Sequence, residues 1–245
     1  MGSHTEFILS PITEILKDVV SASAGIGSGI ETYPLCDYVM QSAFLKTTGF
    51  QEQKMKCITW ELATIDFDYR RALLGNDDNL GECSSYTDKN KIYKRLMIQI
   101  KKHDPSFDLA SDIDRKAILK ETLAFIKSVF ENTNLAIWAQ SNFSWFLNQK
   151  HLIKPEHFLH QDGKGRPNLF ENVLQDKYEV LYNHRNRIAH NTHSYQQNLP
   201  TLKALINDDH KYENYFLYFS ILLLIDKIFR ALYLKYLDAI EDIIR

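Results

Sequence analysis

The sequence predicts an all-α fold, an elaborated helical bundle, and three observations carry this prediction. Glycine and proline supply only 9 and 6 of the 245 residues, well below the roughly 12% that globular chains average. So few turn-forming residues over this length indicate long elements. Apolar side chains recur at the three- and four-residue spacing of helices. No run of alternating β-branched residues indicates a strand, so the periodic segments are expected to pack as helices around one core.

The expected helices cover residues 6–20, 34–48, 51–74, 89–102, 112–132, 134–148, 169–190 and 210–243. Gly49 separates the second helix from the third, and Asp112 and Asp114 begin the fifth, as helix N-termini prefer. The glycine-rich segment 21–29, the polar segment 75–88 and the segment 150–168 are expected to be loops. The last helix is strongly apolar over residues 216–234, which predicts that it is buried centrally or lies at a subunit contact.

Composition and charge exclude several classes of protein. Apolar residues make up 44% and charged residues 24% of the chain, as in ordinary globular proteins, so residues 1–245 are expected to form a single domain rather than a disordered chain. The formal net charge of −2 excludes a histone-like basic protein. Any contact with nucleic acid must therefore be local.

The sequence predicts neither a membrane-spanning helix nor a signal peptide. Its longest apolar run ends at Asp226, short of the roughly 18 apolar residues that suggest a membrane span. Acidic residues interrupt the N-terminal apolar pattern, unlike a signal peptide. Cys36, Cys57 and Cys83 lack metal-type spacing and fit a reducing compartment. We therefore expect a cytoplasmic protein, and we assign no function to residues 1–4.

Six of the nine histidines fall within residues 151–193, and histidine is the side chain that titrates near neutral pH. His157 and His160 are three residues apart, and His184 could join them at a zinc ion after folding. The HExxH motif of zinc enzymes is absent, however, and the HFLH segment lies beside an expected loop. We therefore expect ordinary surface histidines rather than a metal site, and no cofactor.

The segment 182–191, with the sequence YNHRNRIAHN, places an arginine on an apolar helix stripe. That stripe consists of Leu174, Tyr178, Leu181 and Ile188. Arg185 occupies the one stripe position that lacks an apolar residue, and a guanidinium facing a core is costly unless it is paired or lies at a wet seam. His190 follows five residues later, about 140° around an ideal helix.

A purely structural explanation of these cations is available. Cations in the last turn of a helix are stabilised by its dipole by about 0.3–1 kcal/mol each. Arg185, Arg187 and His190 could occupy their positions for that reason alone. From the residues by themselves, this explanation is favoured over a functional one.

The segment Arg185-Asn186-x-x-x-His190 resembles the Arg-polar-x(3–5)-His signature of HEPN-domain proteins. It lies near the end of a helix in an all-α chain and precedes one more long apolar helix, which is where this signature usually sits in HEPN folds. The resemblance covers about residues 170–240. It implies an elaborated helical bundle of HEPN type, with residues 112–245 as the HEPN-like core and residues 1–110 as an N-terminal helical elaboration.

HEPN proteins with this motif are typically metal-independent RNA endonucleases of toxin, abortive-infection and antiviral systems. The resemblance implies that Arg185 holds the scissile phosphate, that His190 is the general acid/base, and that Asn186 orients the histidine or the phosphate. RNA supplies its own nucleophile, the 2′-hydroxyl, so no metal-bound water is needed and the product is a 2′,3′-cyclic phosphate. A forked guanidinium suits the charge that builds on the reacting phosphate.

The expected partners follow from the same resemblance. Because one chain offers one Arg–His set, we expect a homodimer with a composite active site, its seam at the apolar stripe that contains Arg185. RNA is the expected substrate, and an antitoxin or an ATPase or sensor protein is a further expected partner. Side chains that could contact RNA are Arg187, Lys177 and Tyr182, with Lys164, Arg166 and Tyr195 as further basic and aromatic residues. Solvated surface positions and packing also explain these residues, and that explanation is favoured. Glu61 could form an ion pair with Arg185, but an ordinary surface carboxylate is the favoured interpretation.

Two other functions stay open from the sequence. One is a non-catalytic HEPN-like module that binds RNA, a nucleotide or a partner protein. The other is a structural helical scaffold in which Arg185 forms a buried ion pair. The contacts of Arg185 and His190 distinguish the nuclease from the scaffold. A cleft at a two-fold axis favours the nuclease, and a buried arginine–carboxylate pair favours the scaffold.

Overall fold

The structure is a computed structural model that describes residues 3–27, 29–75, 83–149, 152–161, 165–190 and 214–244. It confirms the all-α fold class, with a single two-stranded sheet in the described part of the chain. The elements in chain order are α1 (Ser3–Leu9), α2 (Thr13–Ser23), the 3-10 helix η1 (Ile30–Thr32), α3 (Tyr33–Ile65), α4 (Phe67–Gly75), α5 (Tyr86–His103), α6 (Leu109–Asp112), α7 (Arg115–Phe130), α8 (Asn134–Trp138), α9 (Gln140–Asn148), the 3-10 helix η2 (Pro155–His157), β1 (Phe158–Gln161), β2 (Pro167–Phe170), α10 (Asn172–His190) and α12 (Tyr215–Ile244).

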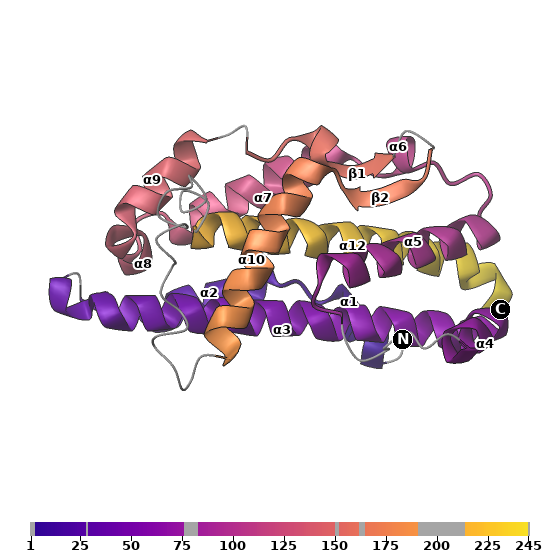
Figure 1. The fold of residues 1–245 in the computed structure, drawn as a ribbon, viewed down its shortest axis with the longest axis horizontal. Helices are drawn as coiled ribbons and strands as arrows, with labels where there is room; N and C mark the ends of the chain where they lie inside the picture. Colours follow the sequence, from indigo (N-terminus) through magenta and orange to yellow (C-terminus); the bar gives the residue numbers. More distant parts are fainter. Residues whose placement is uncertain are drawn as a thin grey trace.

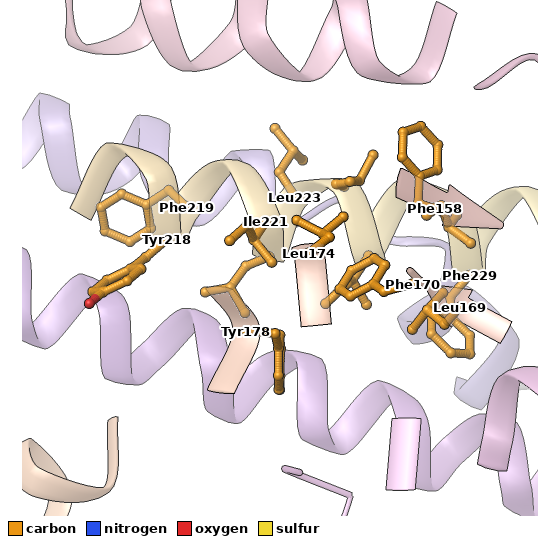
Figure 2. Close-up of a cluster of buried hydrophobic side chains, with 14 of the residues drawn as sticks. Phe158, Leu169, Phe170, Leu174, Tyr178, Tyr218, Phe219, Ile221, Leu223 and Phe229 are labelled. Carbon is orange, nitrogen blue, oxygen red and sulfur yellow. The ribbon is translucent and has the colours of Figure 1, made fainter. Parts of the chain in front are cut away.

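Helix α12 forms the centre of the bundle. Every residue from Phe216 to Ile225 is at most 1% exposed, and α3, α5 and α7 pack along the helix (Figure 1). Figure 2 shows Leu174 of α10 and side chains of both strands gathered beside α12. Two positions were expected for the last helix, at the centre of the bundle or at a subunit contact. The structure shows the first, and burial on all faces explains the apolar character of the helix. None of the described helices is long and apolar enough to cross a membrane.

Helix α3 runs unbroken through Gly49, so the predicted boundary at that glycine is wrong. A buried stripe continues on both sides of it: Met40, Ala43, Phe44, Thr47, Gln51, Lys54, Met55, Ile58 and Leu62. Packing of this stripe outweighs the roughly 1 kcal/mol that glycine costs inside a helix. The helix ends instead at Ile65. The carboxylate of the next residue, Asp66, accepts a hydrogen bond from the Tyr69 backbone N–H at 3.0 Å at the start of α4.

Two other expected helices are also divided, and a third begins later than expected. The expected helix 6–20 becomes α1 and α2, with Pro11 between them, because proline lacks the N–H that a continuous helix needs. The expected helix 112–132 starts only at α7, where the Asp114 carboxylate accepts a hydrogen bond from the Ala117 N–H at 2.9 Å. Ala139 separates α8 from α9 within the expected helix 134–148.

The sequence did not predict a β-hairpin, and one lies in the expected loop 150–168 and in the first two residues of the expected helix 169–190. Strands β1 and β2 are antiparallel, with Phe158 opposite Phe170 and His160 opposite Asn168. Each strand has four residues, too few for a recognisable alternating pattern. The hairpin is attached to α5, because the Tyr86 hydroxyl donates to the Phe170 carbonyl at 3.1 Å and accepts from its N–H at 3.2 Å.

Helix α10 begins directly after this hairpin, and the hairpin therefore sets its starting point. The helix crosses α3 and α12 steeply, and its C-terminal end extends past α3 (Figure 1). Leu174, Tyr178 and Leu181 of its apolar stripe are buried within the chain itself. These three positions are therefore not available to a second copy. The expectation that the stripe faces a dimer seam is restricted to the C-terminal part of α10.

The N-terminal and C-terminal parts of the chain share one core. Helices α3 and α5, which belong to residues 1–110, both pack on α12. Their buried residues belong to the same hydrophobic cluster as those of α10 and α12. The N-terminal helices therefore form part of the bundle that supports the motif.

Candidate functional site

Arg185 is held by an ion pair between α10 and α3. Its Nη2 lies 3.6 Å from Oε2 of Glu52, and the two side chains are 24% and 17% exposed. Its Nη1 donates a hydrogen bond to Oδ1 of Asn186 at 3.1 Å. Asn186 thus contacts the arginine, whereas the motif implied a contact with the histidine or the phosphate. The guanidinium is paired with a carboxylate and still reaches solvent. It is therefore intermediate between the open cleft expected of a nuclease and the buried ion pair expected of a scaffold.

The carboxylate partner of Arg185 is Glu52. Of the two interpretations of Glu61, the pairing with Arg185 is therefore wrong. Glu61 lies nine residues further along α3, about 13 Å along the helix axis. Its Oε1 is 3.0 Å from Nδ1 of His4. Glu52 also pairs with Lys56 at 2.9 Å on the next turn of α3. This i,i+4 spacing was the available sequence signal for a surface ion pair at Glu52.

A small pocket, called here the Arg185 pocket, lies where α10, α3 and the start of α5 meet. Its wall combines two cations, one carboxylate, one amide and several hydroxyl groups. The lining residues are Thr48, Gln51, Glu52, Ser84, Lys89, Tyr178, Leu181, Tyr182 and Arg185. The pocket therefore joins residues from sequence positions that no motif connects.

Lys89 is a buried cation on the wall of this pocket, and sequence analysis missed it. The side chain is 2% exposed. Its Nζ donates to the carbonyl oxygens of Cys83 at 2.8 Å and Ser84 at 3.0 Å, and it lies 5.4 Å from the centre of the Tyr178 ring. Burial lowers the pKa of Lys89 to about 7. A lysine in a polar sequence context resembles an ordinary surface residue, so its burial became visible only in three dimensions.

Gln51 braces the same region from α3. It is buried, and its Nε2 donates to the Leu222 carbonyl of α12 at 2.9 Å. Its Oε1 has no hydrogen-bond partner among the described residues. An unpaired buried acceptor is costly. The Gln51 Oε1 atom is therefore an acceptor in the lining of the Arg185 pocket that a hydrogen-bond donor could satisfy.

A second ion pair fixes α3 against α12 close to Glu52. Lys54 Nζ lies 2.6 Å from Oδ1 of Asp226, and the two side chains are 2% and 0% exposed. Asp226 Oδ2 also accepts the N–H of Ile12 at 3.3 Å, and Lys54 donates to the Ser10 carbonyl. Burial lowers the pKa of Lys54 and raises that of Asp226. These contacts join α3, α12 and the segment before α2 into one rigid support.

His184 belongs to an aromatic cluster between α10, α3 and the start of α12. Its ring centre lies 5.6 Å from that of Phe44 and 5.4 Å from those of Tyr215 and Tyr218. Arg187 Nη2 donates to its Nδ1 at 3.2 Å, and its Nε2 is 3.1 Å from the Tyr215 hydroxyl. No group of three potential ligands for a metal ion occurs among the residues that the structure describes.

The expected site residues are only partly brought together. Tyr182 lines the Arg185 pocket, and Arg187 is exposed on the next turn of α10. Lys177 donates to the Val173 carbonyl at 3.4 Å and lies about 12 Å before Arg185 along the helix axis. Exposed Arg166 lies just before β2, distant from Arg185 in sequence.

His190 is the last residue of α10, so the helix carries it beyond Arg185 at the end that extends past α3. Its side chain lies outside what the structure describes, as do Lys164 and Tyr195. The roles expected for these three residues stay predictions. Comparison of the chain with protein-family models, curated proteins and solved structures finds no match.

Proposed function

We propose that this chain is a metal-independent RNA endonuclease of HEPN type that acts in toxin or antiviral defence in the cytoplasm. It cleaves RNA by attack of the 2′-hydroxyl and leaves a 2′,3′-cyclic phosphate. The observation that carries the proposal is the partly exposed guanidinium of Arg185 near the end of α10, held by the single carboxylate of Glu52.

The contact with Glu52 supports a role in phosphate binding. At 3.6 Å it is longer than a good charge-assisted hydrogen bond, which lies near 2.7–2.9 Å. A phosphodiester can replace such a carboxylate without leaving a buried charge unpaired, because the guanidinium already reaches solvent. Asn186 holds the other edge of the guanidinium, so the side chain is oriented before substrate arrives.

His190 supplies the acid–base chemistry in this proposal. Cleavage needs one group to accept the 2′-hydroxyl proton and another to protonate the leaving 5′-oxygen. One chain provides one such histidine in the motif, and a second copy provides the other in a homodimer with a composite active site. Tyr182, which lines the Arg185 pocket, and Arg187, which is exposed on the same helix, are proposed to contact neighbouring bases and phosphates. An antitoxin or an ATPase or sensor protein is the proposed regulatory partner.

The test is cleavage of a labelled single-stranded RNA in the presence of EDTA. The wild type should cut RNA but not DNA or 2′-O-methyl RNA, and products should end in a cyclic phosphate. His190→Ala and Arg185→Gln should lose activity and change the free energy of unfolding by no more than about 1 kcal/mol, since the last residue of a helix carries little packing and a partly exposed ion pair contributes little. Controls are His160→Ala on β1 and Arg71→Gln on α4, which should cleave normally. Cleavage of DNA, or activity restored only by a divalent metal, contradicts the proposal.

The same ion pair favours a second candidate, a structural scaffold without catalysis. Glu52 links α3 to the C-terminal part of α10 through Arg185, as a scaffold would require. Under this alternative no variant affects RNA, and Arg185→Gln lowers the melting temperature as much as Glu52→Gln does. A non-catalytic module would instead bind RNA without cutting it.

A further inference from the structure

Lys89 reaches back from the first turn of α5 to the segment that precedes it. Two of its three N–H groups bind the carbonyls of Cys83 and Ser84. The Ser84 carbonyl accepts a second hydrogen bond from the Tyr178 hydroxyl at 2.7 Å. The ammonium therefore fixes segment 83–85 against α10 on the inner wall of the Arg185 pocket.

The charges around Lys89 do not balance. No carboxylate forms an ion pair with it within the described ranges, although Glu52 of α3 and Asp88 of α5 act on it electrostatically. Arg185 of α10 acts with the opposite sign. The thiol of Cys83 and the hydroxyl of Tyr178 are neutral near pH 7, because burial raises the pKa of each. Glu52 is thus the one carboxylate lining a pocket that also contains Lys89 and Arg185.

The charge of Lys89 therefore determines how strongly Glu52 neutralises Arg185. When Lys89 is charged, the carboxylate interacts with Lys56, Arg185 and Lys89, and the pocket keeps surplus positive charge. When Lys89 is neutral, Glu52 neutralises a larger share of the charge on the guanidinium. A phosphodiester that approaches Arg185 then meets a weaker positive potential.

We propose that Lys89 is a positioning residue for phosphate binding, whose buried ammonium offsets Glu52 and leaves Arg185 available to a phosphodiester of RNA. This inference rests on the proposed function and adds a regulation of the same site by pH. Burial is the main cause that brings the pKa of Lys89 to about 7. The ammonium is charged below that pH and loses its proton as the pH rises, so phosphate affinity should fall across neutral pH.

The first test measures binding without cleavage. A fluorescent 2′-O-methyl RNA 12-mer lacks the nucleophile, and its Kd is followed by anisotropy from pH 5.5 to 8.5 at constant low salt. Wild-type affinity should fall about three- to tenfold through neutral pH, the size expected for one nearby charge. Lys89→Met should bind weakly at every pH, and Lys89→Arg should bind tightly at every pH. The His190→Ala variant should retain the step, which separates Lys89 from the histidine.

The second test does not depend on RNA. With lysine labelled at 13Cε in the full chain, one NMR signal should titrate near pH 7 and be absent in Lys89→Met. Glu52→Gln should lower this pKa and Arg185→Gln should raise it, because the coupling between charges is reciprocal. These two variants leave Lys89 in place, so the measurement remains decisive even where Lys89→Met fails to fold.

The outcomes separate the two proposals. Failure of every variant to bind the oligonucleotide overturns the proposed function, while the lysine titration still decides whether Lys89, Glu52 and Arg185 are coupled. An unchanged pH step in Lys89→Met, or a neutral-pH titration that neither Glu52→Gln nor Arg185→Gln shifts, overturns the role of Lys89.

Discussion

The guanidinium of Arg185 and the carboxylate of Glu52 form an ion pair that joins α10 to α3, with 3.6 Å between Nη2 and Oε2. The other carboxylate oxygen of Glu52 forms an ion pair with Lys56 on the same helix. The negative charge of Glu52 is therefore shared between Arg185 and Lys56. This sharing is the physical basis for expecting that a phosphate can compete for Arg185.

Removing the Glu52 charge should tighten nucleic-acid binding and leave the fold almost unchanged. We expect Glu52→Gln to bind 2′-O-methyl RNA several-fold more tightly at low salt, and to change unfolding free energy by no more than about 1 kcal/mol, as for partly exposed ion pairs. Anisotropy and urea unfolding measure the two effects. Glu61→Gln makes the same charge change on the same helix and is the matched control. Equal tightening by both variants would indicate a general charge effect.

The geometry of Arg185 should matter beyond its charge. Arg185→Lys keeps the positive charge but removes the planar fork that binds two phosphate oxygens. We expect cleavage by this variant to fall at least about tenfold, equivalent to roughly 1.4 kcal/mol of transition-state stabilisation. Single-turnover rates at saturating RNA measure the change. Wild-type rates in Arg185→Lys would show that a point charge is sufficient.

The Lys54–Asp226 pair should be costly to break and nearly neutral to replace. Asp226→Asn leaves the buried Lys54 ammonium without its counter-charge, and we expect a loss of about 3–5 kcal/mol in unfolding free energy. The double variant Lys54→Met/Asp226→Leu removes both charges and should lose much less. Urea unfolding of the single and double variants measures this coupling. Additive losses would mean that the two side chains do not act as a pair.

The Asp66 carboxylate should make the free energy of unfolding depend on pH in the acidic range. Burial by itself would raise the pKa of its carboxyl, but hydrogen bonds from Lys102, the Tyr69 N–H and Gln99 lower it below the usual range. A lowered folded-state pKa stabilises the protein above the unfolded value, about 3.9, and this contribution is lost as the pH falls further. Asp66→Asn should therefore lower the urea midpoint at pH 7.

The acid dependence supplies the check on this explanation. Between pH 4 and pH 2 the urea midpoint of the wild type should fall more steeply than that of Asp66→Asn. Parallel curves for the two proteins would show that the carboxylate carries no net stabilisation.

The proposed composite site requires a dimer. Leu174, Tyr178 and Leu181 are buried within the chain, so the contact must use the C-terminal part of α10. We expect sedimentation at micromolar concentration to show twice the 28.6 kDa of one chain. A mixture of inactive Arg185→Gln and His190→Ala chains should regain part of the activity if the site combines two copies. A single 28.6 kDa species would count strongly against the dimer.

The sequence located most of the elements but placed several of their ends wrongly. Gly49 lies within α3 because buried residues continue on both sides of it, and a propensity of about 1 kcal/mol cannot compete with that packing. The hairpin of β1 and β2 was missed because strands of four residues carry little periodic signal. Pro11 indicates a helix boundary, but the apolar periodicity of residues 6–20 led to the prediction of one continuous helix.

The sequence by itself determined the helical class, the strongly apolar character of the last helix and the presence of Arg185 on an otherwise apolar stripe, because these depend on composition and helical spacing within one segment. That α12 lies at the centre of the bundle, and not at a subunit contact, was decided by the tertiary structure. The partners of Arg185 were decided only by tertiary structure. Glu52 and Lys89 lie on two other helices, and nothing in their local sequence separates them from the surface carboxylates and lysines of the same chain. Their significance arises from burial and from the crossing of α10 over α3, and burial is a property that a charged residue acquires only when the helices have packed.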